Sequence, residues 1–145
     1  MLVSDILSAK SRPLVTATVE MTIPEAMRLL LTHKISCLPV LSQAKLVGIV
    51  SDKDIFALVH REPDTFRERK VWDIMTENVM TALPDDEIYQ VAAIMTRHRF
   101  RHMPIVENDN VIGLVSIGDI VKAQLDSMSD ENNYLRKYIS GEYPG

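Results

Sequence analysis

The chain has 145 residues, of which 46% are hydrophobic and 25% are charged, so it is able to bury a core and remain soluble. Its first residues lack a basic region before an apolar run, and no segment approaches the roughly 18–20 apolar residues of a membrane span. The net charge of −4 argues against general attraction to nucleic acid. The single cysteine cannot form an internal disulfide, and we therefore expect a cytoplasmic protein.

An internal repeat organises the sequence. Residues 16–55 align without a gap on residues 81–120, with identities at Thr16/Thr81, Ala17/Ala82, Ile23/Ile88, His33/His98, Pro39/Pro104, Gly48/Gly113, Val50/Val115, Ser51/Ser116, Asp54/Asp119 and Ile55/Ile120. Residues 3–7 match residues 71–75, so the first copy holds three extra residues within 8–13. Such repetition predicts two units that pack on each other. Their predicted bounds are 1–60 and 71–126, with a charged linker at 61–70 and a tail at 127–145.

Each copy shows the same order of elements: a strand, a helix, two strands and a second helix. The predicted strands are 14–18, 37–41 and 46–50 in the first copy and 79–83, 102–106 and 111–115 in the second. Thr22 to Glu25 has the pattern of a capping box at the start of the first helix. Tight turns at 42–45 and 107–110 join the paired strands, and the second helices begin near Ser51 and Ser116.

The predicted fold class is therefore α/β, with two β-α-β-β-α repeats packed as a pseudo-two-fold pair. Strands 46–50 and 111–115 are apolar throughout, which predicts burial on both faces. The tail contains a predicted short helix with a face formed by Tyr134, Leu135, Tyr138 and Ile139. We expect this face to pack on the body or on a dimer mate, or else to recognise another protein.

The pattern Ser-x-x-Asp recurs where each second helix begins, as Ser51–Asp54 and Ser116–Asp119. One interpretation is helix capping, in which the hydroxyl and the carboxylate accept free backbone N–H groups. The other is a ribose site, because a carboxylate accepts two hydrogen bonds from a cis-diol and a helix N-terminus favours a phosphate. Antiparallel pairing places Arg101 and His102 beside Ser116, where they add donors for phosphate oxygens.

The P-V or P-I on the first hairpin strand and the G-hydrophobic-V-S-x-x-D signature resemble CBS domains, named for cystathionine β-synthase, over about residues 1–126. A tandem pair of them is called a Bateman module. The resemblance implies an adenine ligand, such as AMP, ADP, ATP, NAD or S-adenosylmethionine, in clefts between the repeats. It assigns ribose hydroxyls to Asp54 and Asp119, the phosphate end to Ser51 and Ser116, phosphate oxygens to Arg101 and His102, and the base to the strand positions Thr16 and Thr81. It also implies a homodimer.

The two copies differ at these positions. Ser36 and Cys37 in the first copy replace Arg101 and His102 of the second, and Lys53 compensates for only part of that lost positive charge. The sequence therefore predicts that the site around Asp119 holds a nucleotide more tightly than the site around Asp54. Cys37 also raises a secondary hypothesis of redox sensing.

Other functions have less support. His98 and His102 have a metal-ligand spacing but lack a third ligand nearby, so no metal site is expected. The basic run at 97–102 contains one aromatic residue, Phe100, rather than a series of them, and the chain is acidic overall, so RNA binding is not expected. An enzyme acting on nucleotides would need a GxxxxGK[ST] loop or clustered carboxylates, which the sequence lacks.

The prediction is thus a non-catalytic sensor of energy or redox state, without a catalytic cofactor, that acts on an unidentified target protein or on its own oligomer. The alternative is a structural adaptor with vestigial clefts, in which each Ser-x-x-Asp serves only as a helix cap.

Overall fold

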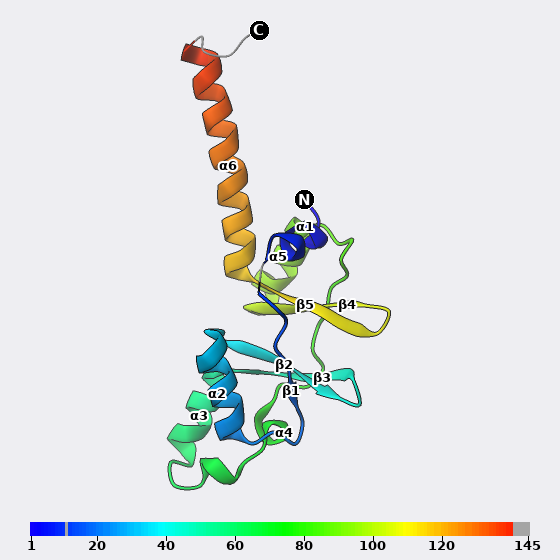
Figure 1. The fold of residues 1–145 in the computed structure, drawn as a ribbon, viewed down its shortest axis with the longest axis vertical. Coiled ribbons are helices and arrows are strands. Elements are labelled where there is room, and N and C mark those ends of the chain that lie inside the picture. Colours follow the sequence, from blue (N-terminus) through cyan, green and yellow to red (C-terminus); the bar gives the residue numbers. More distant parts are fainter. Residues whose placement is uncertain (11, 141–145) are drawn as a thin grey trace.

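The computed structural model describes residues 1–10 and 12–140 and confirms the predicted α/β fold of two similar halves (Figure 1). In the first half, the strands β1 (Ala17–Thr18), β2 (Cys37–Ser42) and β3 (Lys45–Ser51) form one sheet in that order. The strand β1 is parallel to β2, and β2 is antiparallel to β3. Two packed helices, α2 (Ile23–His33) and α3 (Asp52–Arg61), complete this half.

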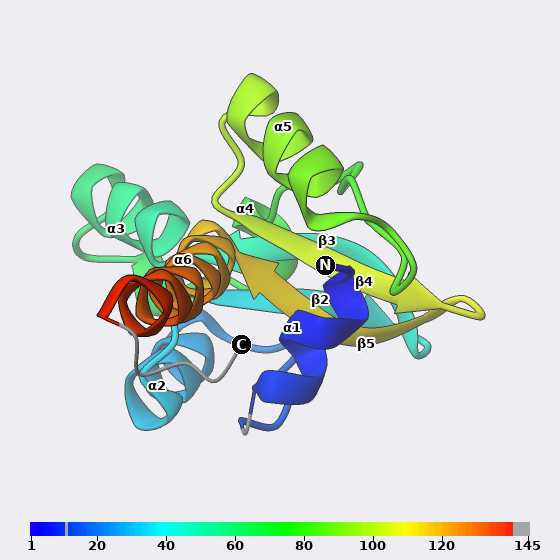
Figure 2. The ribbon, with the colours of Figure 1, turned by 90° about the horizontal axis from the view of Figure 1, so that it is seen from above.

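The second half repeats this plan with α5 (Ile88–His98), β4 (His102–Glu107), β5 (Asn110–Ser116) and α6 (Ile117–Ser140). The strand predicted at 79–83 is reduced to one parallel bridge between Ala82 and Ile105. The two hairpins stack on each other, with β3 against β5 (Figures 1 and 2). This stacking places the start of each hairpin close to the other repeat.

Local sequence signals account for the helix starts and the hairpin turns. The Thr22 hydroxyl accepts a hydrogen bond from the Glu25 backbone N–H (3.3 Å), and the Glu25 carboxylate accepts one from the Thr22 N–H (3.1 Å). Both central residues of each turn have positive φ, namely Gln43 (50°), Ala44 (66°), Asn108 (53°) and Asp109 (65°). Turns of this kind match the twist of the paired strands, so they fix both hairpin registers.

Two short helices are exchanged between the halves. The helix α1 (Val3–Ala9) buries Val3 and Ile6 in the core of the second half, and α4 (Val71–Ile74) buries Val71 in the core of the first. Glycines allow this close approach: a Cβ on Gly113 would lie 2.5 Å from a methyl of Leu7 in α1. The core of each half is thus completed by the segment that precedes the other repeat in the sequence.

Three further parts of the structure differ from the sequence prediction. The charged linker contains a 3-10 helix, Phe66–Glu68, whose Phe66 is only 8% exposed and packs in the first core. The strands β3 and β5 bury one face only, and on the other face of β5 Ile112 is 42% exposed and lines the cleft described below.

The third difference is the tail, where the predicted short helix is the continuation of α6. This single helix of 24 residues extends away from both sheets (Figure 1). The predicted apolar face at 134–139 lies outside the residues whose side chains the structure describes. Within the described chain, no helix combines the length and the apolar composition that a bilayer crossing requires.

Candidate functional site

A cleft of about 990 Å³ lies between the two halves. Its walls come from the end of α1, the connection at 12–15, the start of β2 at 34–37, the middle of β5 at 112–114 and the first turns of α6. Ligand pockets in proteins are commonly ~300–1,000 Å³, so the cleft has the size of a nucleotide site.

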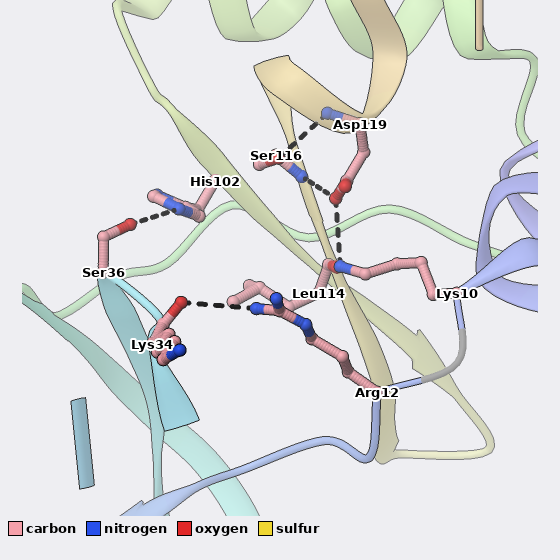
Figure 3. Close-up of polar contacts among 8 residues, drawn as sticks. All are labelled: Lys10, Arg12, Lys34, Ser36, His102, Leu114, Ser116 and Asp119. Atoms are coloured by element: carbon pink, nitrogen blue, oxygen red, sulfur yellow. Dashed lines mark hydrogen bonds and ion pairs between the residues drawn. The ribbon is translucent and has the colours of Figure 1, made fainter. Parts of the chain in front are cut away.

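Asp119 lies in this cleft at the N-terminus of α6 (Figure 3). Its Oδ2 accepts a hydrogen bond from the Ser116 backbone N–H (2.9 Å), and the Ser116 hydroxyl accepts one from the Asp119 N–H (3.0 Å). The capping interpretation is therefore confirmed for this pair. The hydrogen bonds that the structure describes for this carboxylate all go to Oδ2, so Oδ1 keeps its capacity to accept.

Lys10 is the second described partner of this carboxylate. Its ammonium donates to Asp119 Oδ2 (3.0 Å) and to the Leu114 carbonyl (2.7 Å), across 109 and 104 positions of sequence. Burial by itself raises the pKa of Asp119, but the Ser116 backbone N–H and the Lys10 ammonium together outweigh it and hold the pKa below 3.8. Asp119 is therefore ionised at neutral pH.

The cations of the cleft are mostly ones that the sequence reasoning missed. The positively charged residues in the lining are Lys10, Arg12, Lys34 and Lys122, and the carboxylates are Asp5, Asp119 and Asp126. The Arg12 guanidinium donates to the Lys34 carbonyl (3.3 Å), which ties the connection from α1 to the end of α2 (Figure 3). Lys10 and Arg12 both fall within residues 8–13, where the first copy carries its extra residues. The three-residue insertion was the feature of the sequence that could have identified these two cations.

His102 and Ser36 meet across the repeats, with the Ser36 hydroxyl 3.1 Å from His102 Nε2 (Figure 3). Both residues line the cleft. Burial lowers the pKa of His102 below 6.5, and the nearby charge of Arg101 lowers it further. His102 is therefore a neutral hydrogen-bonding group at pH 7 and contributes no positive charge to the cleft.

Cys37 touches the cleft wall, but its side chain is only 2% exposed. Burial raises the pKa of the thiol to about 12, and the charges of Asp54 and Asp52 raise it in the same direction. The reactive thiolate is therefore scarce at neutral pH, which argues against the redox-sensing hypothesis.

The remaining sequence-predicted residues are not part of the lining of this cleft. They are Thr16, Ser51, Lys53, Asp54, Thr81 and Arg101. Ser51 and Asp54 form the same capping box as their counterparts, with distances of 2.9 and 3.3 Å. Thr81 lines a smaller pocket of about 470 Å³ near the hairpin turns. The backbone beside the cleft is 13–15, just before β1, rather than Thr16.

The antiparallel register confirms two further expectations. His102 pairs with Ser116, and Cys37 pairs with Ser51, as predicted for the start and the end of each hairpin. Arg101 accepts a backbone hydrogen bond from Ile117 (3.0 Å), although its side chain is exposed outside the cleft. His98 stacks on Phe100 with the ring centroids 5.5 Å apart. Among the described residues, no group of three or more His, Cys, Asp or Glu side chains is arranged to hold a metal ion.

Comparison with known proteins accounts for this architecture. The family model described as CBS domain matches residues 3–61 and 71–126. The CBS-domain protein ATU1752 of Agrobacterium tumefaciens has a similar structure, with a TM-score of 0.80 and 34% identity over 86% of this chain and 99% of that one. The CBS domain pair of protein MJ0100, solved with 5′-methylthioadenosine and S-adenosyl-L-methionine, gives a TM-score of 0.76 and 32% identity over 88% and 98%. CBSX2 of Arabidopsis thaliana, solved with AMP, gives a TM-score of 0.73 and 25% identity over 86% and 97%. This chain therefore belongs to the CBS domain family and contains two CBS domains in tandem.

Proposed function

We propose that this protein is a non-catalytic regulatory module that binds an adenine nucleotide, or a related adenosine ligand, in the cleft around Asp119. The observation that carries the proposal is an ionised carboxylate at a helix N-terminus, paired with Lys10 in a cleft of nucleotide size. The ligands of the similar proteins, AMP and S-adenosyl-L-methionine with 5′-methylthioadenosine, support the same class.

The residues of the cleft suit the three parts of such a ligand. The Asp119 carboxylate accepts from the ribose hydroxyls, and the backbone at 13–15 and at 34–36 lies opposite as an edge for the base. Lys10 and Arg12 provide donors for phosphate oxygens, and the N-terminus of α6 adds its positive dipole end. The neutral His102 contributes a hydrogen bond without a charge.

Lys10 has to exchange partners when the ligand binds. In the structure it occupies the carboxylate that the ribose hydroxyls need. A nucleotide that displaces Lys10 from Asp119 offers it a phosphate instead, whereas a nucleoside without phosphate does not. Lys10 therefore favours phosphorylated ligands over unphosphorylated ones.

The regulatory output follows from how the cleft is built. Its walls belong to both halves, so a bound ligand favours one relative placement of the halves. The shift that results equals the difference in affinity for the two placements, typically ~1–3 kcal/mol. The receiver of this change is a target protein or a second copy of this chain.

Asp119→Ala and Asp54→Ala provide the central test, because each removes the acid of the same capping box at a helix start. In calorimetric titrations of ligand-free protein with AMP, ADP, ATP, NAD and S-adenosylmethionine, we expect Asp119→Ala to weaken the best ligand at least tenfold. Asp54→Ala should leave that affinity within about twofold. The reverse order would contradict the assignment of the site, and no binding heat from any of the five would favour the structural adaptor.

Lys10→Met tests the exchange of partners. Removing the ammonium frees Asp119 for the ribose but deletes a phosphate contact, so affinity for ATP should fall while affinity for adenosine should rise. Lys53→Met is the matched control, because Lys53 is an exposed lysine of α3 outside the cleft. An equal loss for ATP and adenosine would contradict this role of Lys10.

A further inference from the structure

The two repeats differ in what occupies the free edge of the second hairpin strand. On β5, the Leu114 carbonyl accepts a hydrogen bond from the Lys10 ammonium (2.7 Å), which also donates to Asp119. The equivalent residue of β3 is Ile49, and its partner is backbone. The Thr76 N–H donates to the Ile49 carbonyl (2.9 Å), and the Ile49 N–H donates to the Thr76 carbonyl (3.0 Å). The edge of β5 thus holds a side chain, whereas the edge of β3 holds main chain.

The difference in length between the two copies accounts for this contrast. After the matching segments 3–7 and 71–75, the first copy uses nine residues, 8–16, where the second copy uses six, 76–81. The longer connection lines the cleft at 12–15. The shorter connection pairs with β3 immediately after α4. The three missing residues therefore keep the second connection on the edge of its strand.

The main chain on β3 stands beside Asp54. On the other side of the molecule the Lys10 ammonium bridges the Leu114 carbonyl and the Asp119 carboxylate, so a group at this edge of β5 is next to that carboxylate. The capping boxes at the starts of α3 and α6 contain the same hydrogen bonds. A group at the edge of β3 near Ile49 is therefore next to the Asp54 carboxylate, where the ribose of a nucleotide would have to approach.

Residues 75–78, here called the strap, are held more firmly than Lys10. Met75 packs directly on β3, because a Cβ on Gly48 would lie 2.6 Å from the Met75 Sδ. The preceding helix α4 buries Val71 in the first core. Displacing the strap breaks two backbone hydrogen bonds and uncovers Met75, whereas the Lys10 ammonium moves away by rotation of its own side chain.

The strap also lacks the charges that suit a phosphate. Its one charged residue is Glu77, whereas the longer connection contributes Lys10 and Arg12 to the cleft around Asp119. Asp54 lines neither that cleft nor the smaller pocket near the hairpin turns. The Asp54 side of the repeat pair is therefore covered by main chain and lacks the phosphate donors that this connection supplies on the Asp119 side.

We propose that the strap closes the Asp54 side, so that each chain holds one nucleotide, in the cleft around Asp119. The nature of the ligand rests on the proposed function, whereas the number of ligands rests on the strap. The two copies then have different tasks. The second supplies the nucleotide-binding carboxylate, and in the first Asp54 serves only to cap α3.

Native mass spectrometry with AMP and with ATP counts the nucleotides bound per chain. We expect one for the wild-type protein, none for Asp119→Ala and one for Asp54→Ala. The decisive variant replaces residues 76–81, TENVMT, by residues 8–16 of the first copy, SAKSRPLVT, and should bind two. Adding Asp54→Ala to this variant should return the number to one. Glu77→Lys is the matched control and should still bind one, because it adds a cation without lengthening the strap.

Hydrogen exchange of the wild-type protein is a second measurement that needs no variant. The amides of Ile49 and Thr76 both donate in the bridge, so both should exchange slowly in the free protein. They should remain equally protected at saturating AMP or ATP. A nucleotide that entered the Asp54 side would have to displace the strap, and the protection of these two amides would then be lost.

The possible failures are distinguishable. Two nucleotides per chain in the wild-type protein, or a folded replacement variant that binds only one, would overturn the proposal. Loss of protection at Ile49 and Thr76 when AMP or ATP binds would also overturn it. A wild-type protein that binds no nucleotide would contradict the proposed function instead, and rapid exchange of the two amides in the free protein would contradict the strap itself.

Discussion

Gly48 and Gly113 occupy equivalent positions of the two repeats, but their substitution by alanine should have unequal effects. A Cβ on Gly48 would lie 2.6 Å from Met75 Sδ and 2.9 Å from the backbone carbonyl oxygen of Thr76. That carbonyl accepts a hydrogen bond from the Ile49 N–H (3.0 Å), and the Thr76 N–H donates to the Ile49 carbonyl (2.9 Å). The new methyl would therefore push directly on the bridge that holds the end of α4 against β3.

The expected loss of unfolding free energy depends on whether the atoms next to the new Cβ can move away. Overpacking in a well-packed region costs ~1–3 kcal/mol. For Gly48→Ala we expect about 2 kcal/mol of lost unfolding free energy, because a hydrogen-bonded backbone cannot rotate away. For Gly113→Ala the nearest atoms are methyl carbons of Leu7, at 2.5 and 3.1 Å, which are the end of a flexible side chain. A rotamer change of Leu7 relieves most of that clash, so we expect a loss below ~1 kcal/mol.

Gly118→Ala is the internal control. A Cβ there would meet only the Ser116 hydroxyl oxygen at 3.5 Å, an ordinary contact, and alanine favours helix over glycine by up to ~1 kcal/mol. The assay is thermal and urea unfolding of the three variants. In a chain of this length about 2 kcal/mol corresponds to a melting temperature lower by roughly 4–8 °C. The reasoning would be refuted if Gly113→Ala were destabilised as much as Gly48→Ala, or if Gly118→Ala were the least stable of the three.

Titration and thiol chemistry provide three further predictions. With its pKa near 12, the Cys37 thiol has a thiolate fraction on the order of 10⁻⁴ at pH 8. A disulfide reagent should therefore modify Cys37 in the folded protein far more slowly than in the unfolded chain. Comparable rates of modification would contradict the burial of this thiol. The lowered pKa of Asp119 contributes stability that is complete above the unfolded value of 3.8 and is lost as the pH falls through the lower folded value. Asp119→Asn should therefore flatten the dependence of melting temperature on pH below about pH 4. An unchanged slope would be evidence against a lowered pKa of Asp119. For His102, whose pKa is lowered, protonation below the unfolded value of 6.5 opposes folding, and its ring signal in NMR should titrate below pH 6.5. A phosphate-bearing ligand in the cleft should raise that midpoint, and a midpoint above pH 6.5 in the free protein would show that burial does not control the ring.

The sequence by itself determined the features that depend on neighbouring residues. The capping boxes at Thr22, Ser51 and Ser116 involve residues three positions apart, and each hairpin turn is closed by its own two central residues. Helical spacing of apolar residues, and short apolar runs bounded by turns, then indicated the helices and strands of both repeats. The same local reasoning placed Asp119 and Ser116 together and His102 beside Ser116, because antiparallel pairing dictates that arrangement.

Only the tertiary structure determined which repeat's binding cleft each residue lines. Cys37 and Ser36 lie in the cleft of Asp119, because the start of β2 packs near the other repeat, and Ser36 bonds to His102 across 66 positions. Lys10 reaches Asp119 across 109 positions because α1 packs in the second half. Contacts between residues so far apart in the sequence leave no local sequence pattern, because they form only when the apolar faces of separate elements pack together. The repeat could therefore be predicted from the sequence. The exchange of α1 and α4 between the halves depended on the packing of the folded chain, and so did the position of the cations in the cleft.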